Sequence, residues 1–379
     1  MEGSQVASRG IIDAATRAKI DSRIISVEDG INDGNQRNWT IIHSKINPRF
    51  FLSIFWAIDD LLSSTNIASL AKFSDSDLIH VLNITKEAYV TAHSLMRVKK
   101  PLLMHFFHSP HNLSDDVFLV RKIAMRAGMY GHLLGNHVLT TTIEMFRFFT
   151  STLKVDSQYV HYAPYPVDTN RFQPIHNRDN LRINHNLPID RPIIAFVGSL
   201  QPERGIFVLM KAFQHVSKAF PKALLLISHP QRRGENIYEK ALFDLIRSLS
   251  LEKNVLVKGP SSNVEEIYNL ADAVVLPLVR PYWVDPPLVL LEAMSSGSAV
   301  VTTPVCGIIE TVCNREDILL AKPNNAISLS EAILELLHNP DEASKIGQQA
   351  RQKIVQKYSY DAVGKNLLKV YNSVLNEKN

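Results

Sequence analysis

The chain has 379 residues, of which 45% are hydrophobic and 21% charged, and this balance excludes disordered, collagen-like and coiled-coil proteins. A net charge of +4 is too small an excess for a nucleic-acid-binding tail, and two cysteines are too few for a disulfide framework. The longest apolar run, residues 50–58, has about half the length of a membrane-spanning helix. Charged residues near the start exclude a signal-peptide core, so we expect a soluble, cytoplasmic protein.

The first half of the chain contains short apolar runs that we expect to form strands. They lie at residues 22–27, 78–82, 102–107 and 137–140. Helical patterns separate them, and this alternation is typical of βαβ units and a parallel sheet. The chain opens on a helical pattern instead of a strand, so either a strand precedes Met1 or the first domain lacks it.

The second half shows the same alternation more regularly. We expect strands at residues 192–197, 223–227, 254–257, 273–276 and 299–302, and helices at residues 205–219, 238–249, 264–270 and 288–296. A polar stretch, Gln173–Asp190, is the candidate linker between two domains. The sequence therefore predicts an α/β protein with two Rossmann-like, doubly wound domains that bind ligands beyond the carboxyl ends of their strands.

Two segments of the second half carry a resemblance to a known family. They are Phe196-Val-Gly-Ser-Leu-Gln-Pro-Glu-Arg-Gly205 and Leu290-Leu-Glu-Ala-Met-Ser-Ser-Gly-Ser-Ala-Val-Val-Thr-Thr-Pro304. With residues 164–174, 255–259 and 265–277, they resemble the retaining GT-B glycosyltransferases of family four, the glycosyl transferases group 1. The match is good over residues 160–310 and loose over residues 1–160.

This resemblance implies two domains that face a cleft. The first, residues 1–172, would bind the acceptor, the second, residues 190–358, would bind a nucleotide-sugar donor, and a helix at residues 359–379 would cross back to the first. The implied activity transfers a hexose-type sugar to an acceptor hydroxyl with retention of anomeric configuration. In the retaining scheme the leaving phosphate itself deprotonates the acceptor, and neither a metal nor another cofactor is required.

A basic residue is expected wherever a diphosphate leaves, because negative charge develops on it during bond cleavage. Arg204 adjoins Gly205 at a helix start, where the helix dipole also favours an anion. The resemblance places Arg204 on the donor diphosphate and also implies donor contacts at Ser199 and Leu288. Ser199 stands where the family usually has a second basic residue. The alternative for Arg204 is a solvated, helix-capping role.

Glu292 is an isolated carboxylate in an apolar run, which packing alone explains poorly because burying an unpaired charge is costly. The resemblance implies that it accepts hydrogen bonds from the nucleotide ribose. Val284 replaces a second family glutamate, and the neighbouring Asp285 is the candidate substitute. Pro286 and Pro287 remove amide donors that would face the sugar. These departures leave open the donor sugar, and also a catalytically weak or inactive relative.

Three further positions complete the candidate site. His108 follows a predicted strand where the family has a histidine beside the reacting centre, so His108, Arg204 and Asp285 form the predicted catalytic set. The loop at Lys258 and Gly259 is implied to lie beside the base, or simply to end its strand. Gly3, with Ser4 and Gln5, resembles the family's glycine turn of the first domain, whose amides approach the donor phosphate or the acceptor.

Histidines at positions 105, 108 and 111 have a spacing that invites a metal-site interpretation. Residues three apart on a strand face opposite sides, so we predict no metal. The expected partners are a nucleotide-sugar donor and a lipid-linked or saccharide acceptor, without nucleic acid. A basic helical pattern at residues 117–134 indicates a peripheral contact with an anionic membrane on its cytoplasmic face, or a solvated surface. A sugar-nucleotide epimerase is the alternative enzyme class.

Overall fold

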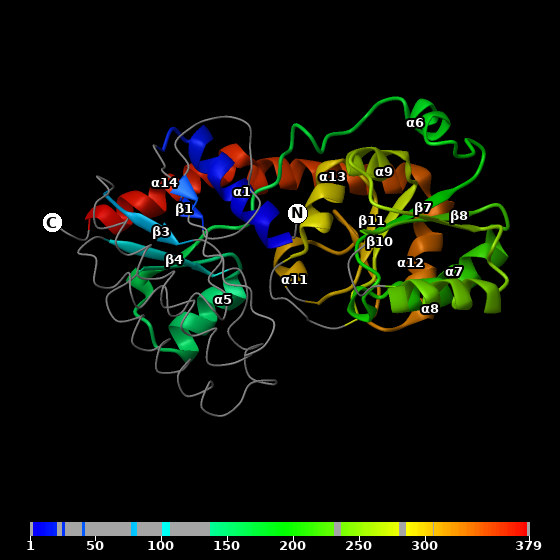
Figure 1. The fold of residues 1–379 in the computed structure, drawn as a ribbon, viewed down its shortest axis with the longest axis horizontal. Helices are drawn as coiled ribbons and strands as arrows, with labels where there is room; N and C mark the ends of the chain where they lie inside the picture. The colour runs from blue at the N-terminus through cyan, green and yellow to red at the C-terminus, as the bar shows by residue number, and fades with distance from the viewer. Residues whose placement is uncertain are drawn as a thin grey trace. The chain divides into compact units, whose positions relative to one another are not determined.

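The computed structural model describes residues 3–20, 25–26, 40–41, 77–81, 101–106, 137–230, 236–279, 286–305 and 307–376. The chain forms two compact units. Unit 1 comprises Met1–Tyr165 with Val363–Asn379, and unit 2 comprises Pro166–Ala362. Each unit is built on its own parallel sheet (Figure 1). The predicted α/β class with two parallel-sheet domains is confirmed.

Unit 1 contains a four-stranded parallel sheet in the order β3-β4-β5-β6. Its strands are β3 (Ile79–Val81), β4 (Leu102–Phe106), β5 (His137–Thr140) and β6 (Val160–Tyr162). A separate parallel pair is formed by β1 (Ile25–Ser26) and β2 (Thr40–Ile41). The helices are α1 (Gly3–Arg17), α5 (Ile143–Arg147) and α14 (Tyr360–Asn376), which begins in unit 2, with a π-helical turn at Phe148–Thr152 and a 3₁₀ turn at Ser157–Tyr159. The strands predicted from the apolar runs of the first half are thus present.

Helix α1 corrects one expectation about the start of the chain. Gly3, Ser4 and Gln5 form its first turn, so the predicted glycine turn is wrong, whereas the predicted helical pattern is confirmed. Helix α14 lies close against α1. The backbones are so close at Gly364 that a Cβ added there would lie 2.3 Å from the Ala14 carbonyl oxygen. A glycine at this position therefore lets the two backbones approach.

Four histidines of the unit 1 sheet lie on one face as two stacked pairs. The rings of His80 and His105 are 5.3 Å apart, and those of His137 and His161 are 5.2 Å apart. Nδ1 of His137 lies 3.0 Å from Nε2 of His161, and Nδ1 of His80 lies 2.5 Å from the Tyr371 hydroxyl on α14. Each pair therefore joins two neighbouring strands, β3 with β4 and β5 with β6, and His80 also contacts α14.

We expect unit 1 to lose stability as the pH falls below about 6.5. Burial lowers the pKa of His80 to about 3 and that of His161 to about 4, so the unfolded chain binds more protons than the folded chain between those values and 6.5. Stability is fully present above the unfolded pKa of about 6.5 and decreases below it. The loss is at most about 1.4 kcal/mol per pH unit for the buried His80 and smaller for the partly exposed His161. Urea unfolding at pH 7.5, 6.0 and 5.0 measures this slope. His80→Asn should reduce the slope, and an unchanged slope would contradict the assignment.

Unit 2 contains a six-stranded parallel sheet in the order β12-β11-β10-β7-β8-β9. The strands are β7 (Ile193–Val197), β8 (Leu224–Ser228), β9 (Val255–Lys258), β10 (Ala273–Leu276), β11 (Val300–Thr302) and β12 (Leu319–Leu320). The chain winds outward from β7 to β9, returns to β10, and winds outward again to β12. The strand order therefore reverses between β7 and β10, the point where doubly wound sheets bind ligands.

Helices cover both faces of this sheet. They are α6 (Arg178–Asn184), α7 (Ile206–Ala219), α8 (Asn236–Ser248), α9 (Val264–Leu270), α10 (Leu288–Ser295), α11 (Ile308–Thr311), α12 (Ala326–His338) and α13 (Pro340–Tyr358). Figure 1 shows α7, α8 and α12 on one side of the sheet and α9 and α13 on the other. A buried core joins the sheet to α7, α8 and α12, with Phe196, Phe213 and Ile333 at its centre.

The predicted linker Gln173–Asp190 contains α6, which packs against α9. Arg182, 4% exposed, donates from Nη2 to Asp272 at 2.8 Å and from Nε to the Leu270 carbonyl at 3.0 Å. A buried guanidinium needs such partners, because an unpaired one would be costly. An ion pair between the buried Arg182 and the partly buried Asp272 therefore holds this polar stretch against the rest of unit 2.

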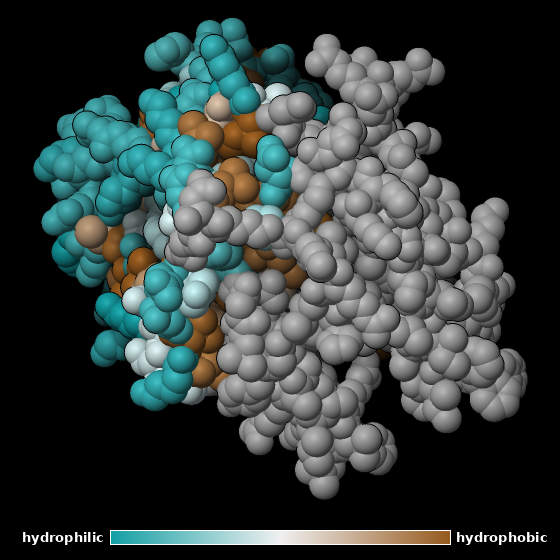
Figure 2. Space-filling view, turned by 90° about the vertical axis from the view of Figure 1, so that its left-hand side faces the viewer, coloured by the Kyte–Doolittle hydropathy of each residue, from teal (hydrophilic) through white to brown (hydrophobic). Residues whose placement is uncertain are grey.

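Among the helices of the described residues, none is both long and apolar enough to cross a bilayer. On the side of the molecule shown in Figure 2, hydrophobic residues lie among hydrophilic ones over the described surface. The basic pattern at residues 117–134 lies outside the described residues, so its membrane contact stays a prediction.

Candidate functional site

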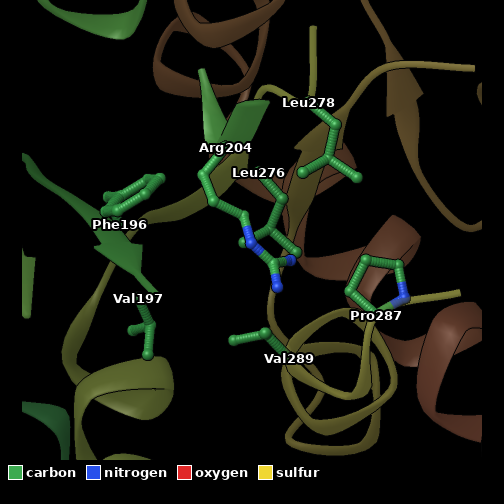
Figure 3. A pocket seen from close by; sticks show the side chains of 7 residues that line it. All are labelled: Phe196, Val197, Arg204, Leu276, Leu278, Pro287 and Val289. Atoms are coloured by element: carbon green, nitrogen blue, oxygen red, sulfur yellow. The ribbon is translucent and has the colours of Figure 1, made fainter. Parts of the chain in front are cut away.

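A hollow opens where the strand order of unit 2 reverses. It is lined by Phe196, Val197, Arg204, Leu276, Leu278, Pro287 and Val289. These residues come from the carboxyl ends of β7 and β10, the loop after β7 and the start of α10. Figure 3 shows the guanidinium of Arg204 extending between the leucines and the first turn of α10. The other described residues that line the hollow are apolar.

The position of Arg204 depends on the glycine that follows it. Arg204 ends a 3₁₀ turn, Pro202–Arg204, and Gly205 adopts a left-handed conformation with φ of 76°. A Cβ added at Gly205 would lie 1.8 Å from the Pro277 carbonyl oxygen. The amide of Val279 also donates to the Glu203 carbonyl at 3.1 Å. The loop after β7 is thereby fixed against the chain that leaves β10.

Ser199 begins the same loop and is 5% exposed. No group among the described residues hydrogen-bonds its buried hydroxyl. A buried hydroxyl without a partner costs free energy, so this position suits a ligand that accepts a hydrogen bond. The preceding Gly198 donates its amide to the Ser228 carbonyl at 3.0 Å, which ties this loop to β8.

The first turn of α10 forms the wall opposite Arg204. Pro287 caps the helix and has no side-chain acceptor for the amides that follow, including that of Leu288. The first amides of a helix and its dipole favour an anion. As the sequence predicted, Pro286 and Pro287 contribute no amide hydrogen of their own. Leu288 and Arg204 are therefore brought to the same part of unit 2, on two sides of the hollow.

Glu292 lies on α10 three residues after Val289, a spacing that places both on one side of the helix. Its carboxylate is half-buried, and Oε2 accepts a hydrogen bond from the Tyr268 hydroxyl at 2.9 Å. Burial raises the pKa of Glu292, while the Tyr268 hydrogen bond and the charge of Arg171 act to lower it. The acid thus lies one helical turn beyond the wall of the hollow.

Lys258 is the last residue of β9, and Gly259 follows it. Both residues form hydrogen bonds within the protein. Nζ of Lys258 donates to the His185 carbonyl at 3.0 Å, and the Ser228 hydroxyl donates to the Gly259 carbonyl at 3.3 Å. Nε2 of His185 in turn donates to Glu266 at 2.6 Å. These bonds hold the end of β9 in place, and the donor contact implied for Lys258 and Gly259 stays a prediction.

Other candidates cannot be placed. His108, Asp285 and Val284 lie outside the described residues, so their roles stay predictions. Within the described part of the chain, no group of three or more His, Cys, Asp or Glu side chains could hold a metal ion. Tyr268 was not predicted, because a tyrosine on the apolar side of a short helix looks like an ordinary core residue.

Comparison with known proteins agrees with this geometry. Residues 177–353 match the family described as glycosyl transferases group 1. The chain is 28% identical over 214 residues to a D-inositol 3-phosphate glycosyltransferase of Corynebacterium urealyticum, and the alignment covers 55% of this chain and 49% of that relative. The chain therefore spans about half the length of that relative.

Solved structures of glycosyltransferases share the fold. A glycosyltransferase from Rickettsia africae superposes with a TM-score of 0.80 at 19% identity and covers 99% of this chain and 96% of its own. HepE of Anabaena, solved with UDP and glucose, gives a TM-score of 0.78 at 17% identity and covers 98% of each chain. The family match covers residues 177–353, slightly less than half of the chain, and the solved structures show that the fold is shared.

Proposed function

We propose that this protein transfers a hexose from a nucleotide-sugar donor to an acceptor hydroxyl with retention of anomeric configuration, as expected of a family-four enzyme. The observation that carries the proposal is the pairing of Arg204 with the first turn of α10 at the strand-order reversal of unit 2. Such a pairing offers a guanidinium and helix amides to one diphosphate. D-Inositol 3-phosphate glycosyltransferase and the UDP complexes of HepE support a nucleotide-sugar donor.

The reaction assigns a role to each charged group. The bond between the sugar C1 and the donor phosphate breaks, and a bond forms between C1 and the acceptor oxygen on the same face. The acceptor proton passes to an oxygen of the leaving diphosphate. Arg204 and the amides of α10 stabilise the negative charge that develops there, so this scheme assigns no step to a metal. Glu292 accepts hydrogen bonds from the ribose hydroxyls, and the catalytic roles of His108 and Asp285 stay predictions.

A donor panel tests the proposal. The purified protein is incubated with UDP-glucose, GDP-mannose and other nucleotide sugars in the presence of saccharide and lipid-linked acceptors, and products are identified by mass spectrometry. We expect a glycosylated acceptor whose anomeric configuration, measured by NMR, equals that of the donor. An inverted product would contradict retention, and an isomerised donor formed without acceptor would indicate an epimerase.

A second function is favoured by the two prolines before α10. Because Pro286 and Pro287 cannot donate amide hydrogens, a sugar placed there finds fewer partners. The alternative is therefore a nucleotide-sugar-binding protein with weak or no transfer. Donor binding without product formation across the full panel would favour this alternative. Cytoplasmic location and contact with an anionic membrane stay predictions.

A further inference from the structure

The hydroxyl of Tyr268 is committed to one acceptor. The residue is 1% exposed, and its hydroxyl donates to Oε2 of Glu292 at 2.9 Å. Burial and the nearby negative charge of Glu292 raise the pKa of Tyr268 well above its ordinary value. The hydroxyl therefore stays protonated at neutral pH and acts as a donor toward the carboxylate.

The carboxylate of Glu292 is only partly satisfied by this bond. Within the described residues, Oε2 accepts the one hydrogen bond that the group receives. An ionised carboxylate offers about four lone-pair sites, so the described residues use only a small part of its accepting capacity. Two vicinal hydroxyls of a sugar ring are the kind of ligand that fills such capacity.

Tyr268 is held through its backbone and through its ring. The Ser298 hydroxyl donates to the Tyr268 carbonyl at 3.0 Å, and the ring lies 6.1 Å from that of Phe172. The Phe172 carbonyl accepts hydrogen bonds from the Ser295 hydroxyl at 2.7 Å and from Arg351 at 2.5 Å. A donor anchored in this way has little freedom to follow the carboxylate, so the carboxylate must adopt the orientation that the tyrosine sets.

We propose that Tyr268 is a positioning residue for donor binding: its hydroxyl fixes Oε2 of Glu292, so that Oε1 is directed to the ribose diol of the nucleotide. This inference rests on the proposed function, because it takes the ribose as the ligand of Glu292. Because the carboxylate of Glu292 is already oriented, it loses little rotational freedom when it binds the diol, and this favours affinity.

The charges around Glu292 determine the sign of its pH response. Tyr268 and Arg171 favour the ionised carboxylate, whereas Glu265 and burial oppose it. On the α13 side, Arg351 donates to the carbonyl and hydroxyl oxygens of Ser295. Removing the Tyr268 hydroxyl takes away a stabilising hydrogen bond, so the Glu292 carboxyl should protonate at a higher pH.

The test measures UDP affinity of the full-length chain by calorimetry from pH 5 to pH 8. Tyr268→Phe should weaken UDP binding about tenfold at neutral pH and move the acidic limb of the affinity profile upward by about one pH unit. The donor KM should rise with little change in kcat. Tyr371→Phe, which removes a buried tyrosine hydroxyl bound to His80 in unit 1, is the matched control for stability and should leave UDP affinity unchanged.

Two outcomes separate the failure of this inference from that of the proposed function. If Glu292→Gln weakens UDP binding but Tyr268→Phe changes only the melting temperature, with the wild-type pH profile, Tyr268 is structural and the inference is overturned. If Glu292→Gln binds UDP as the wild type does, the ribose contact itself is wrong, and with it this part of the proposed function.

Discussion

Replacing Arg204 with alanine is expected to lower kcat/KM for the nucleotide-sugar donor by about a hundredfold to a thousandfold, the usual loss when a preorganised group is removed from a developing charge. The guanidinium extends into a hollow whose other described lining residues are apolar. Arg204→Lys should recover part of the loss, since it keeps the charge but not the forked donor geometry. Initial rates at subsaturating donor measure the effect.

Arg315 provides a matched control for the loss of a positive charge. It belongs to the same unit and forms an exposed ion pair with Glu335, through Nη2 and Oε2 at 3.0 Å. Exposed pairs contribute little, so Arg315→Ala should keep wild-type turnover and nearly wild-type stability. Equal turnover of the Arg204 and Arg315 variants would show that Arg204 does not act on the donor.

Replacing Gly205 with alanine is expected to destabilise unit 2 by about 3 kcal/mol and to abolish most turnover. The new Cβ would lie 1.8 Å from the Pro277 carbonyl oxygen, on a residue whose φ of 76° already disfavours a side chain. The loop must then move away from β10 and carry Arg204 with it. Urea unfolding gives the change in free energy, and donor turnover gives the functional loss.

Gly198→Ala distinguishes the steric clash expected in Gly205→Ala from the effect of a positive φ alone. Gly198 also has a positive φ, of 148°, but a Cβ there would meet its nearest atom, Cζ of Phe196, at 3.8 Å. Its free-energy loss should therefore be smaller than that of Gly205→Ala. Equal losses would mean that the contact between Gly205 and Pro277 does not matter.

Much of the fold could be predicted because the elements of unit 2 follow simple patterns. Short apolar runs such as Pro192–Val197 gave β7, and a stripe of apolar residues gave α7. Burial on both faces of a parallel sheet makes such runs continuous, so they stand out in the sequence. The alternation of these runs with helices then predicted the doubly wound order.

Several of the elements that were missed are short or polar, but the long helices α12 and α13 were not named from the sequence either. Strands β2, β6 and β12 have two or three residues each, too few to show a hydrophobic period. Helix α6 lies in a polar stretch and is anchored by the long-range pair of Arg182 with Asp272. A helix that depends on a contact with a residue about ninety positions away cannot be predicted from a local sequence pattern.

The candidate site, too, could be predicted only in part. Glu292 could be singled out because packing poorly explains an acid in an apolar run, and Arg204 because it adjoins a glycine at a helix start in a segment that resembles the family. The bond from Tyr268 to Glu292 and the engagement of Lys258 by the His185 carbonyl could not, since they join residues whose neighbourhood only the folded chain creates.

The central claim is that Arg204 and Glu292 bind one nucleotide, and comparing the affinities of UDP and uridine tests it most directly. Arg204→Ala should weaken UDP about a hundredfold yet leave uridine unchanged, because the nucleoside has no diphosphate. Glu292→Gln should weaken both ligands about tenfold, because both carry the ribose diol. Wild-type affinity of either variant for UDP, or a loss of uridine binding in Arg204→Ala alone, would contradict the account.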